Sequence, residues 1–312
     1  MKWVTDPSGE REVAPRVEGP VGGVIGAVPK GLVTLRITFY GVRGSTPCCC
    51  ESNQRVGGNT ACVVVEGDGF DPLVLDLGTG LRFWGVDVLA AQSAPLRATA
   101  LVSHLHWDHV QGLPFFPPIH QPGTEMHIIG PPQQGGSLEE VFKAFLCPPV
   151  FPVGLDDLVG IITFAEAGSE PIVHGTATIT ARDVPHVGPT VGYRIDHGGR
   201  SIAYISDHQQ PGAGSTSVAE DVIALCDGVD VLIHDAQYTP AEFDERSDWG
   251  HCTLDYALEV AVQSRVKALA LFHHDPGHDD AMIDRLTSEL VGRSPEGGPR
   301  IFTASEGLVV DV

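Results

Sequence analysis

The six residues from His104 to His109 constrain this chain more than any other segment. They read His-Leu-His-Trp-Asp-His and directly follow residues 96–102, a short alternating apolar run that predicts a buried strand. Neutral imidazole nitrogen and carboxylate oxygen are the ligands that Zn²⁺ and similar divalent ions prefer. Crowded at one strand end, these groups would repel one another or lose solvation unless a cation lay between them. The pattern therefore predicts a metal site rather than a solvated, His-rich loop.

The length and composition are typical of a globular protein with a large core. The chain has 312 residues, of which 42% are hydrophobic and 19% charged, enough for one large domain or two small ones. No apolar stretch approaches the ~20 residues that cross a bilayer. The N-terminus shows no apolar core followed by a small-residue cleavage site. We therefore expect a cytoplasmic protein with no membrane partner.

The charge balance is strongly acidic. The sequence has 19 Lys and Arg against 40 Asp and Glu, a formal net charge of −21. Broad electrostatic binding to DNA, long RNA or anionic membranes needs clustered basic side chains, so these partners are not expected. Bound divalent ions would reverse the potential locally, so a small anionic substrate remains compatible with the composition.

The seven cysteines do not predict a disulfide framework. Cys48, Cys49 and Cys50 are consecutive, and adjacent cysteines cannot easily bridge each other. The total is odd and no C-x-x-C pair occurs, so reduced thiols are expected and the triplet is given no role.

The pattern along the chain predicts a mixed α/β fold. Residues 1–33 hold Pro, Gly and charged residues with weak periodicity and are interpreted as an irregular N-terminal extension. No repeat or linker divides residues 34–312, which we expect to form a single domain. Early strands follow one another and later strands alternate with helices, which predicts a four-layer αββα sandwich of two mixed β-sheets.

The expected elements are set by apolar periodicity, turn residues and caps. Strands are predicted at 35–40, 61–66, 73–76, 96–102, 176–181, 191–195, 201–205, 229–233, 267–272, 300–303 and 308–310. Helices are predicted at 137–145, 219–226, 253–264 and 279–290. Residues 110–170 are rich in Pro and aromatic residues, and only the helix that opens at the Ser137 capping box is predicted there.

Further candidate ligands follow other predicted strands. His186 lies shortly after one strand, Asp207 after another, and His273 and His274 end a third. Each alone also fits an ordinary loop histidine or an aspartate that caps a turn. Together with the six-residue motif they indicate a dinuclear metal site.

The order of these motifs resembles the metallo-β-lactamase superfamily over essentially all of residues 34–312. It is most similar to the phosphodiesterase branch, the tRNA 3′-processing endonucleases and small bacterial cyclic-phosphate phosphodiesterases. The segments that carry the resemblance are 76–80, 104–109, 186, 204–207, 233–236, 250–253 and 271–274. The H-x-H-x-D-H motif indicates the superfamily, and the later elements point towards phosphodiesterases. Cys252 stands where the family usually has serine.

The resemblance implies two divalent metal ions, Zn²⁺ with Mn²⁺ or Fe as alternatives. The ligands that it implies are His104, His106 and His186 for one ion, Asp108, His109 and His273 for the other, and Asp207 between them. His274 is the alternative last ligand, because the register at this strand end is uncertain by one residue.

The resemblance also implies roles around the metals. Asp76 would be a carboxylate that orients the ligand imidazoles, each of which needs its second N–H satisfied. His251 would be a proton shuttle near the leaving group, oriented by Asp235. Asn59, in the loop Gly57-Gly58-Asn59-Thr60, is interpreted either as a substrate contact or as part of a turn that needs glycine.

The expected function is hydrolysis of a small or cyclic nucleotide-like phosphodiester through a metal-bridging hydroxide, with Asp108, His251 and Asp235 as catalytic residues. A lactone, thioester or β-lactam would suit the same chemistry and remains an alternative, as does tRNA 3′-end cleavage. A redox diiron enzyme is disfavoured because His106 stands where a resemblance to that branch would require a carboxylate. A non-enzymatic metal-binding or degenerate scaffold is disfavoured because every ligand position is retained.

Long tRNA is not expected as the substrate, because Lys143 and Arg182 are the only basic residues between positions 110 and 185. The phenylalanines in this stretch would form either an apolar rim that stacks a base or ordinary core packing. They are Phe115, Phe116, Phe145 and Phe151. Many relatives in the branch are dimers, so the resemblance leaves a homodimer open.

Overall fold

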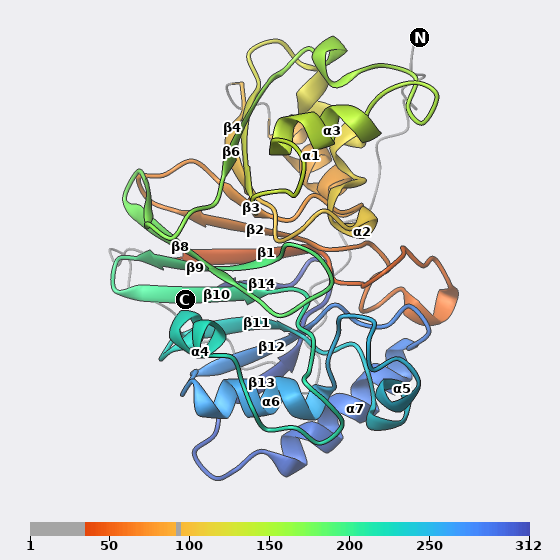
Figure 1. Cartoon of the computed structure of the whole chain (residues 1–312), viewed down its shortest axis with the longest axis vertical. Coiled ribbons are helices and arrows are strands. Elements are labelled where there is room, and N and C mark those ends of the chain that lie inside the picture. Colours follow the sequence, from red (N-terminus) through yellow and green to blue (C-terminus); the bar gives the residue numbers. More distant parts are fainter. Residues whose placement is uncertain (1–34, 92–94) are drawn as a thin grey trace. The chain divides into compact units, whose positions relative to one another are not determined.

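Two mixed β-sheets of seven strands each form the centre of the fold, shown as the computed structural model in Figure 1. The structure describes residues 35–91 and 95–312, within one unit that spans Val33–Val312. The irregular extension that the sequence predicts over residues 1–33 lies outside the described residues. No helix in the described ranges is both long and apolar enough to span a bilayer.

The first sheet has the strand order β14-β1-β2-β3-β4-β5-β6. Its strands are β1 (Leu35–Gly41), β2 (Cys62–Gly67), β3 (Leu73–Leu75), β4 (Arg97–Leu101), β5 (Glu125–Gly130), β6 (Ile161–Glu166) and β14 (Val309–Asp311). The strands from β14 to β3 pair antiparallel, and those from β3 to β6 pair parallel. Parallel strands place their carboxyl ends at the same edge, so the residues after β3 and β4 meet there.

The second sheet repeats this division, in the order β13-β12-β11-β10-β9-β8-β7. Its strands are β7 (Ile172–His174), β8 (Ala177–Asp183), β9 (Val191–His197), β10 (Arg200–Ile205), β11 (Val231–Asp235), β12 (Ala268–Phe272) and β13 (Arg300–Thr303). β10 to β13 pair parallel, whereas β7 to β10 pair antiparallel. The ends of β10, β11 and β12 therefore form a second shared edge.

Helices cover the outer faces of both sheets (Figure 1). The α-helices are α1 (Leu81–Ala90), α2 (Trp107–Val110), α3 (Leu138–Phe145), α4 (Glu220–Cys226), α5 (Pro240–Glu245), α6 (Leu254–Gln263) and α7 (Asp280–Arg293). Four 3₁₀ turns are η1 (Glu51–Asn53), η2 (Leu113–Phe115), η3 (Pro117–His120) and η4 (Leu155–Asp157). α1 and α3 pack on the first sheet, and α4, α6 and α7 pack on the second.

Three apolar layers separate these four layers of secondary structure. One lies between the sheets and includes Ile37, Val63, Ile195 and Ile233. The other two lie between each sheet and its helices. Every residue of β11 and β12 is buried, because these strands are covered on both faces. The predicted αββα sandwich is confirmed.

Side-chain caps fix where several helices begin. Ser137 accepts a hydrogen bond from the Glu140 amide while the Glu140 carboxylate accepts from the Ser137 amide, which is the predicted capping box of α3. Thr253 and Asp279 cap α6 and α7 with a single bond each: their side-chain oxygens accept from the amides of Tyr256 and Met282.

The sequence prediction missed three helices, α1, α2 and α5, and three strands. The expectation of no strand between residues 110 and 170 is wrong, because β5 and β6 lie there. β7, at residues 172–174, was also missed. β5 lies inside the sheet and β6 at its edge, and both lie between proline-rich connections. The apolar alternation of Met126 and Ile128 within β5 is too short to be recognised as a strand pattern.

Tyr193 on β9 ties the second sheet to the first. Its fully buried hydroxyl donates to the carbonyls of Val102 and Ile129, at 2.8 and 3.2 Å. Val102 directly follows β4 and leads into His104, so this contact also fixes the start of the histidine-rich loop.

We expect Tyr193→Phe to lower the free energy of unfolding by about 1–3 kcal/mol, because the Val102 carbonyl loses a buried partner. Urea unfolding followed by circular dichroism measures it. Tyr40→Phe is the matched control, since its hydroxyl bonds Asp87 at a position where water can replace it. Equal small losses in both variants would contradict the role given to Tyr193.

Candidate metal centre

The candidate ligands come from the carboxyl ends of strands in both sheets. His104 follows β4, His186 follows β8, Asp207 follows β10 and His273 follows β12. Ligand sites of α/β proteins lie at such strand ends, where the backbone leaves the sheet and side chains from distant segments converge. The topology therefore brings together residues up to 169 positions apart, from 104 to 273.

A single helical turn arranges the six-residue motif. His106 is extended and lies just before α2, and the amide of His109 bonds the carbonyl of His106 at 3.0 Å. This turn buries Asp108 and His109, whereas His106 remains exposed to solvent. One short segment thus supplies ligands to two neighbouring positions.

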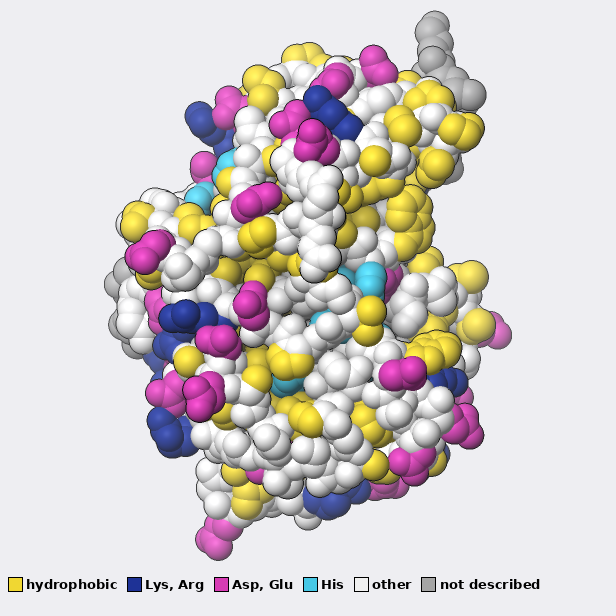
Figure 2. All heavy atoms as spheres, viewed as in Figure 1, with side chains coloured by type: hydrophobic (Ala, Val, Ile, Leu, Met, Phe, Trp, Pro, Cys, Tyr) yellow, Lys and Arg dark blue, Asp and Glu magenta, His cyan; other side chains and the backbone are white. Residues whose placement is uncertain are grey.

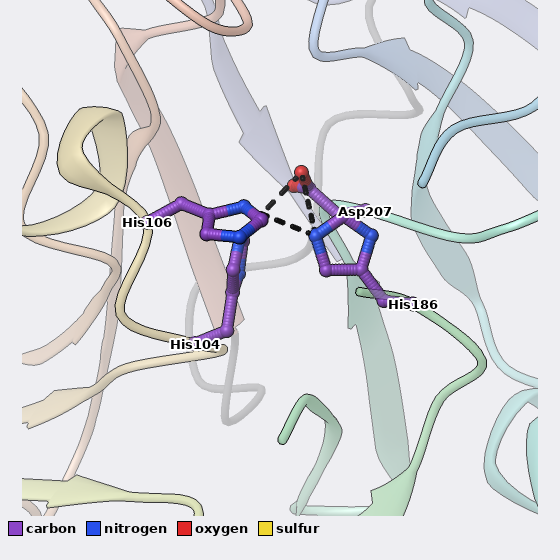
Figure 3. A group of neighbouring side chains, drawn as sticks. All are labelled: His104, His106, His186 and Asp207. Carbon is purple, nitrogen blue, oxygen red and sulfur yellow. Dashed lines mark hydrogen bonds and ion pairs between the residues drawn. The ribbon is translucent and has the colours of Figure 1, made fainter. Parts of the chain in front are cut away.

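The first group of ligand atoms consists of His104, His106, His186 and Asp207, whose donor atoms all lie within 4.8 Å of one another. Figure 3 shows the three imidazoles and the carboxylate pointing toward a common centre. His186 Nε2 lies 3.2 Å from His106 Nδ1, and Asp207 Oδ2 lies 3.7 Å from His104 Nε2.

The second group consists of Asp108, His109 and His273. His273 Nε2 lies 3.2 Å from Asp108 Oδ2 and 3.3 Å from His109 Nε2. Asp207 joins the two groups. Its Oδ2 faces the first group, and its Oδ1 lies 3.3 Å from His109 Nε2 and 3.4 Å from His273 Nε2.

The buried polar atoms of the centre lack sufficient partners within the protein. His104 Nε2 and Asp207 Oδ1 are buried and have no hydrogen-bond partner. Buried polar atoms are rarely left unpaired, because each loses its hydration without compensation. Two divalent cations would satisfy both atoms and separate the facing ring nitrogens, so the residues present fit such ions.

The charges of the centre are set by burial and by the neighbouring carboxylates. Burial, followed by the nearby His109, holds the pKa of His104 well below its usual range, which keeps this imidazole in the neutral, metal-binding form. Burial also acts to lower the pKa of His109, but Asp108, then Asp207 and Asp76, outweigh it and raise that pKa well above the ordinary value. In the metal-free centre the carboxylates therefore favour the protonated form of His109.

Asp76 orients His109 through a hydrogen bond to its Nδ1 atom. Its carboxylate is fully buried and accepts four hydrogen bonds, from His109 Nδ1 at 2.8 Å, the Tyr204 hydroxyl at 2.7 Å, and the amide and hydroxyl of Ser103 at 2.6 and 2.8 Å. Asp76 has φ 60°, so the predicted strand ends one residue earlier, at Leu75. Fixing the second nitrogen of a ligand histidine sets its tautomer and orientation.

Gln237 performs the same task for His273. Its Oε1 accepts from His273 Nδ1 at 2.8 Å, and its amide nitrogen bonds the Ser45 hydroxyl at 3.2 Å. The Ser45 backbone amide donates in turn to Asp108 Oδ2 at 2.8 Å. A Cβ on Gly44 would collide with the His273 ring, so the loop after β1 can close over this ligand only with glycine there.

Gly250 positions His186. Its carbonyl accepts from His186 Nδ1 at 2.7 Å, and its φ of 93° favours glycine. A Cβ at this position would collide with the imidazole. The backbone of the segment that carries His251 therefore also holds a ligand of the first group.

His251 and Asp235 form a hydrogen-bonded pair beside the ligands. His251 Nδ1 lies 3.1 Å from Asp235 Oδ2 and 3.6 Å from Asp207 Oδ2. Burial acts to lower the pKa of His251, but Asp235 and its hydrogen bond outweigh it and raise that pKa above the ordinary value. Asp235 also accepts from the amides of His208 and Gln237, both at 3.0 Å, which fixes the carboxylate.

Two candidates from the sequence do not face the ligand groups. His274 is buried, and its Nε2 donates to the Ala304 carbonyl at 3.1 Å, so His273 rather than His274 lies against Asp108. The Asn59 side-chain amide and backbone amide both bond Glu306, at 3.0 and 2.6 Å. Asn59 thus belongs to the loop in which Gly57 has φ 105°.

Sequence reasoning gave no role to Ser103 and Gln237, and none to Tyr204 and Gly250, although these two lie in segments that carry the resemblance. All are neutral residues that act through another side chain, and only their places near strand ends or beside a candidate ligand distinguish them in the sequence.

Sequence comparisons place related proteins along most of the chain. A family model described as "Beta-lactamase superfamily domain" matches residues 79–274. A ribonuclease Z from Haloarcula marismortui is 25% identical over 310 residues, covering 82% of this chain and 91% of the relative. An uncharacterized protein of Mycobacterium tuberculosis is 28% identical over 258 residues, covering 78% and 82%.

Solved structures share the same architecture. A diphosphatase of the PhnP family superposes with a TM-score of 0.61 and 19% identity, covering 88% of this chain and 97% of that structure. Zinc-bound PqqB from Methylobacterium extorquens superposes with a TM-score of 0.62 and 18% identity, covering 89% and 100%. At these identities the likeness shows the fold alone. With the family match, the αββα sandwich and the buried His/Asp cluster, this chain belongs to the metallo-β-lactamase superfamily.

Proposed function

We propose that this protein is a dinuclear-metal-dependent phosphodiesterase that acts on a small or cyclic nucleotide-like phosphodiester. The observation that carries this proposal is the position of Asp207, whose two oxygens face two separate ligand groups with the His251–Asp235 pair alongside. One carboxylate between two groups suits a pair of ions that act on a single phosphate.

Zn²⁺ is the favoured ion, because the ligand set is rich in imidazole, and Mn²⁺ or Fe are the alternatives. The first ion would be held by His104, His106 and His186, and the second by Asp108, His109 and His273, with Asp207 shared. When bound, a pair of such ions lowers the pKa of a coordinated water and neutralises charge on the phosphoryl oxygens.

His251 supplies the proton that the leaving group needs. Its Nδ1 is engaged by Asp235, which leaves Nε2 for an oxygen of the substrate. The carboxylates of Asp235 and Asp207 raise its pKa, so the ring holds a proton more readily than a free histidine does. Asp235 fixes the ring orientation, and its own position is fixed by two backbone amides.

Phosphodiesters are favoured over carbonyl substrates by the named relatives. Several relatives are named ribonuclease Z, an enzyme that by its name cleaves RNA. A small substrate is favoured by charge. The chain carries a net charge of −21, and Lys143, one of only two basic residues between positions 110 and 185, is paired with Glu139 and Asp156.

A substrate panel tests the proposal. The purified protein, loaded with Zn²⁺ or Mn²⁺ in turn, is assayed with bis(p-nitrophenyl) phosphate, cyclic nucleotides, an oligonucleotide, a thioester and a lactone. We expect turnover of the small phosphodiesters. Turnover confined to the thioester or lactone would reject the proposal in favour of a carbonyl hydrolase on the same fold.

We expect His251→Ala to keep its metal ions and to lower kcat by roughly 10²–10⁴-fold, because it removes a proton donor and no proposed ligand. Metal content by elemental analysis and steady-state kinetics measure the two effects. His127→Ala is the matched control, because it removes a histidine of β5 that is hydrogen-bonded to Thr163 on the neighbouring strand β6. Loss of metal in His251→Ala would instead make His251 a ligand.

We expect His104→Ala to lose the metal ion of the first group while the second group stays occupied, and Asp207→Ala to weaken both, because this carboxylate faces both groups. Elemental analysis of protein reconstituted with Zn²⁺ and desalted measures the stoichiometry. His274→Ala is the comparison, since it removes a buried histidine outside both groups. Equal metal content in all three variants would contradict the ligand assignment.

We expect zinc binding to release protons, because the neighbouring carboxylates raise the pKa of His109 in the metal-free centre and a ligand imidazole must be neutral. The affinity for zinc should therefore rise with pH. For each proton released, it should fall by about tenfold when the pH is lowered by one unit. Calorimetric titration in buffers of different ionisation enthalpy counts the protons. A zinc affinity that does not change with pH near neutrality would show that metal binding does not remove a proton from His109.

A further inference from the structure

Two exposed tryptophans directly adjoin, along the chain, residues that build the metal centre. Among the large hydrophobic residues that are exposed in the described part of the chain, three are aromatic: Trp107 at 53%, Phe115 at 54% and Trp249 at 62%. Exposed apolar surface that is grouped rather than scattered marks a binding site more often than chance placement does. Trp107 and Trp249 each lie next to a residue that builds the centre.

Trp107 stands on the side of the first sheet. It lies between His106 and Asp108 in the sequence, and its ring meets Phe145 edge-on at 5.8 Å. Phe115 packs against Phe151 in the same manner at 5.9 Å. The phenylalanines of this region therefore divide in role, because Phe116 is fully buried and stacks on Trp84, whereas Phe115 is exposed.

Trp249 stands on the side of the second sheet, directly before Gly250, whose carbonyl binds His186. The Arg246 guanidinium lies over its ring at 5.6 Å and is itself paired with Asp275 at 3.1 Å. Val187, 53% exposed, follows His186 directly. Each tryptophan is thus held by one neighbour and leaves much of its ring open.

The two tryptophans are exposed residues that adjoin, along the chain, the exposed side of the first ligand group, which we call its mouth. Trp107 follows His106 in the sequence, Trp249 adjoins the residue that binds His186, and the facing nitrogens of these two histidines are 3.2 Å apart. Figure 2 shows exposed imidazole between two groups of hydrophobic side chains on this face.

The segments that form this mouth carry no basic residue. Residues 104–116, 184–190 and 247–253 contain neither Lys nor Arg, and Arg246 is engaged by Asp275 and by the aromatic rings of Trp249 and Tyr238. A polynucleotide would bring several phosphates that find no cation here. Flat apolar surfaces without cations instead suit one aromatic ring next to one phosphate.

We infer that Trp107 and Trp249 form an aromatic clamp that selects phosphodiesters in which a nucleobase or aryl ring adjoins the scissile phosphate. This inference rests on the proposed phosphodiesterase function and names its substrate class. The tryptophans contact the ring of the substrate, and the metal ligands contact its phosphate, so the two contacts can be tested separately.

Two substrates with the same leaving group isolate the clamp. Thymidine 5′-(p-nitrophenyl phosphate) and methyl p-nitrophenyl phosphate both release p-nitrophenol, and only the first carries a base on the retained side. We expect Trp107→Ala and Trp249→Ala each to lower the ratio of the two kcat/KM values by about 5- to 150-fold, mainly through KM. Trp107→Phe and Trp249→Phe should restore most of the ratio, because phenylalanine keeps a stacking face.

Val291→Ala on α7 is the matched control, since it removes an exposed apolar side chain remote from the centre in sequence and element, and it should leave the ratio unchanged. A ratio unchanged within twofold in both tryptophan-to-alanine variants would overturn the clamp. Equal losses on both substrates would overturn it as well, because the effect would then not depend on the ring.

A binding measurement separates failure of the clamp from failure of the proposed function. Calorimetric titration of the zinc-loaded protein with adenosine 5′-monophosphate and with ribose 5-phosphate compares two phosphates that differ by the base. We expect the first to bind more tightly, and the alanine variants to lose that preference. If wild type hydrolyses no phosphodiester yet shows the preference, the clamp holds and the proposed reaction fails; if wild type binds both equally, the clamp fails.

Discussion

The rest of this structure depends on one constraint at the metal centre. There, imidazole nitrogens and carboxylate oxygens face one another with too few hydrogen atoms to pair them all in hydrogen bonds. His104 Nε2 and Asp207 Oδ1 have no hydrogen-bond partner, and two pairs of ring nitrogens lie 3.2 and 3.3 Å apart. Such an arrangement is unfavourable in a dry protein interior unless cations occupy it. The protein tolerates it because the surrounding sandwich fixes each group from outside the centre.

That support has a visible conformational cost. Four non-glycine residues in the described part of the chain have positive φ, and three of them, Ser45, Asp76 and His273, touch the centre. A left-handed backbone at such a residue costs of order 1–3 kcal/mol and persists only where the surrounding contacts determine it. Here each strained residue makes a hydrogen bond that orients a ligand, so strain and function occur at the same positions.

The candidate ligands could be proposed from the sequence because their chemistry and their position agree. The H-x-H-x-D-H segment concentrates charge and imidazole in six residues. His186 and Asp207 could be assigned to the same site because each follows a predicted strand and because the order of the motifs resembles the superfamily. The choice between His273 and His274 required the structure, because a shift of one residue after a strand reverses the side to which a side chain points.

The supporting residues could not be predicted in this way. Tyr204 and Gln237 are neutral and common residue types, and their roles depend on which side chain the fold places 2.7–2.8 Å away. The same holds for Gly250, where the need for glycine comes from its positive φ and from the approach of the His186 ring. For β5 and β6 the difficulty was local. Short strands between proline-rich connections carry too few residues for periodicity to distinguish them.

The most direct measurement is a crystal structure of the zinc-reconstituted protein with anomalous data collected at the zinc edge. Two anomalous peaks are predicted on opposite sides of the Asp207 carboxylate, at about 2.0–2.2 Å from its oxygens and from the imidazoles of His104 and His273. Either no peak among these side chains, or zinc bound only by residues elsewhere in the molecule, would contradict the account.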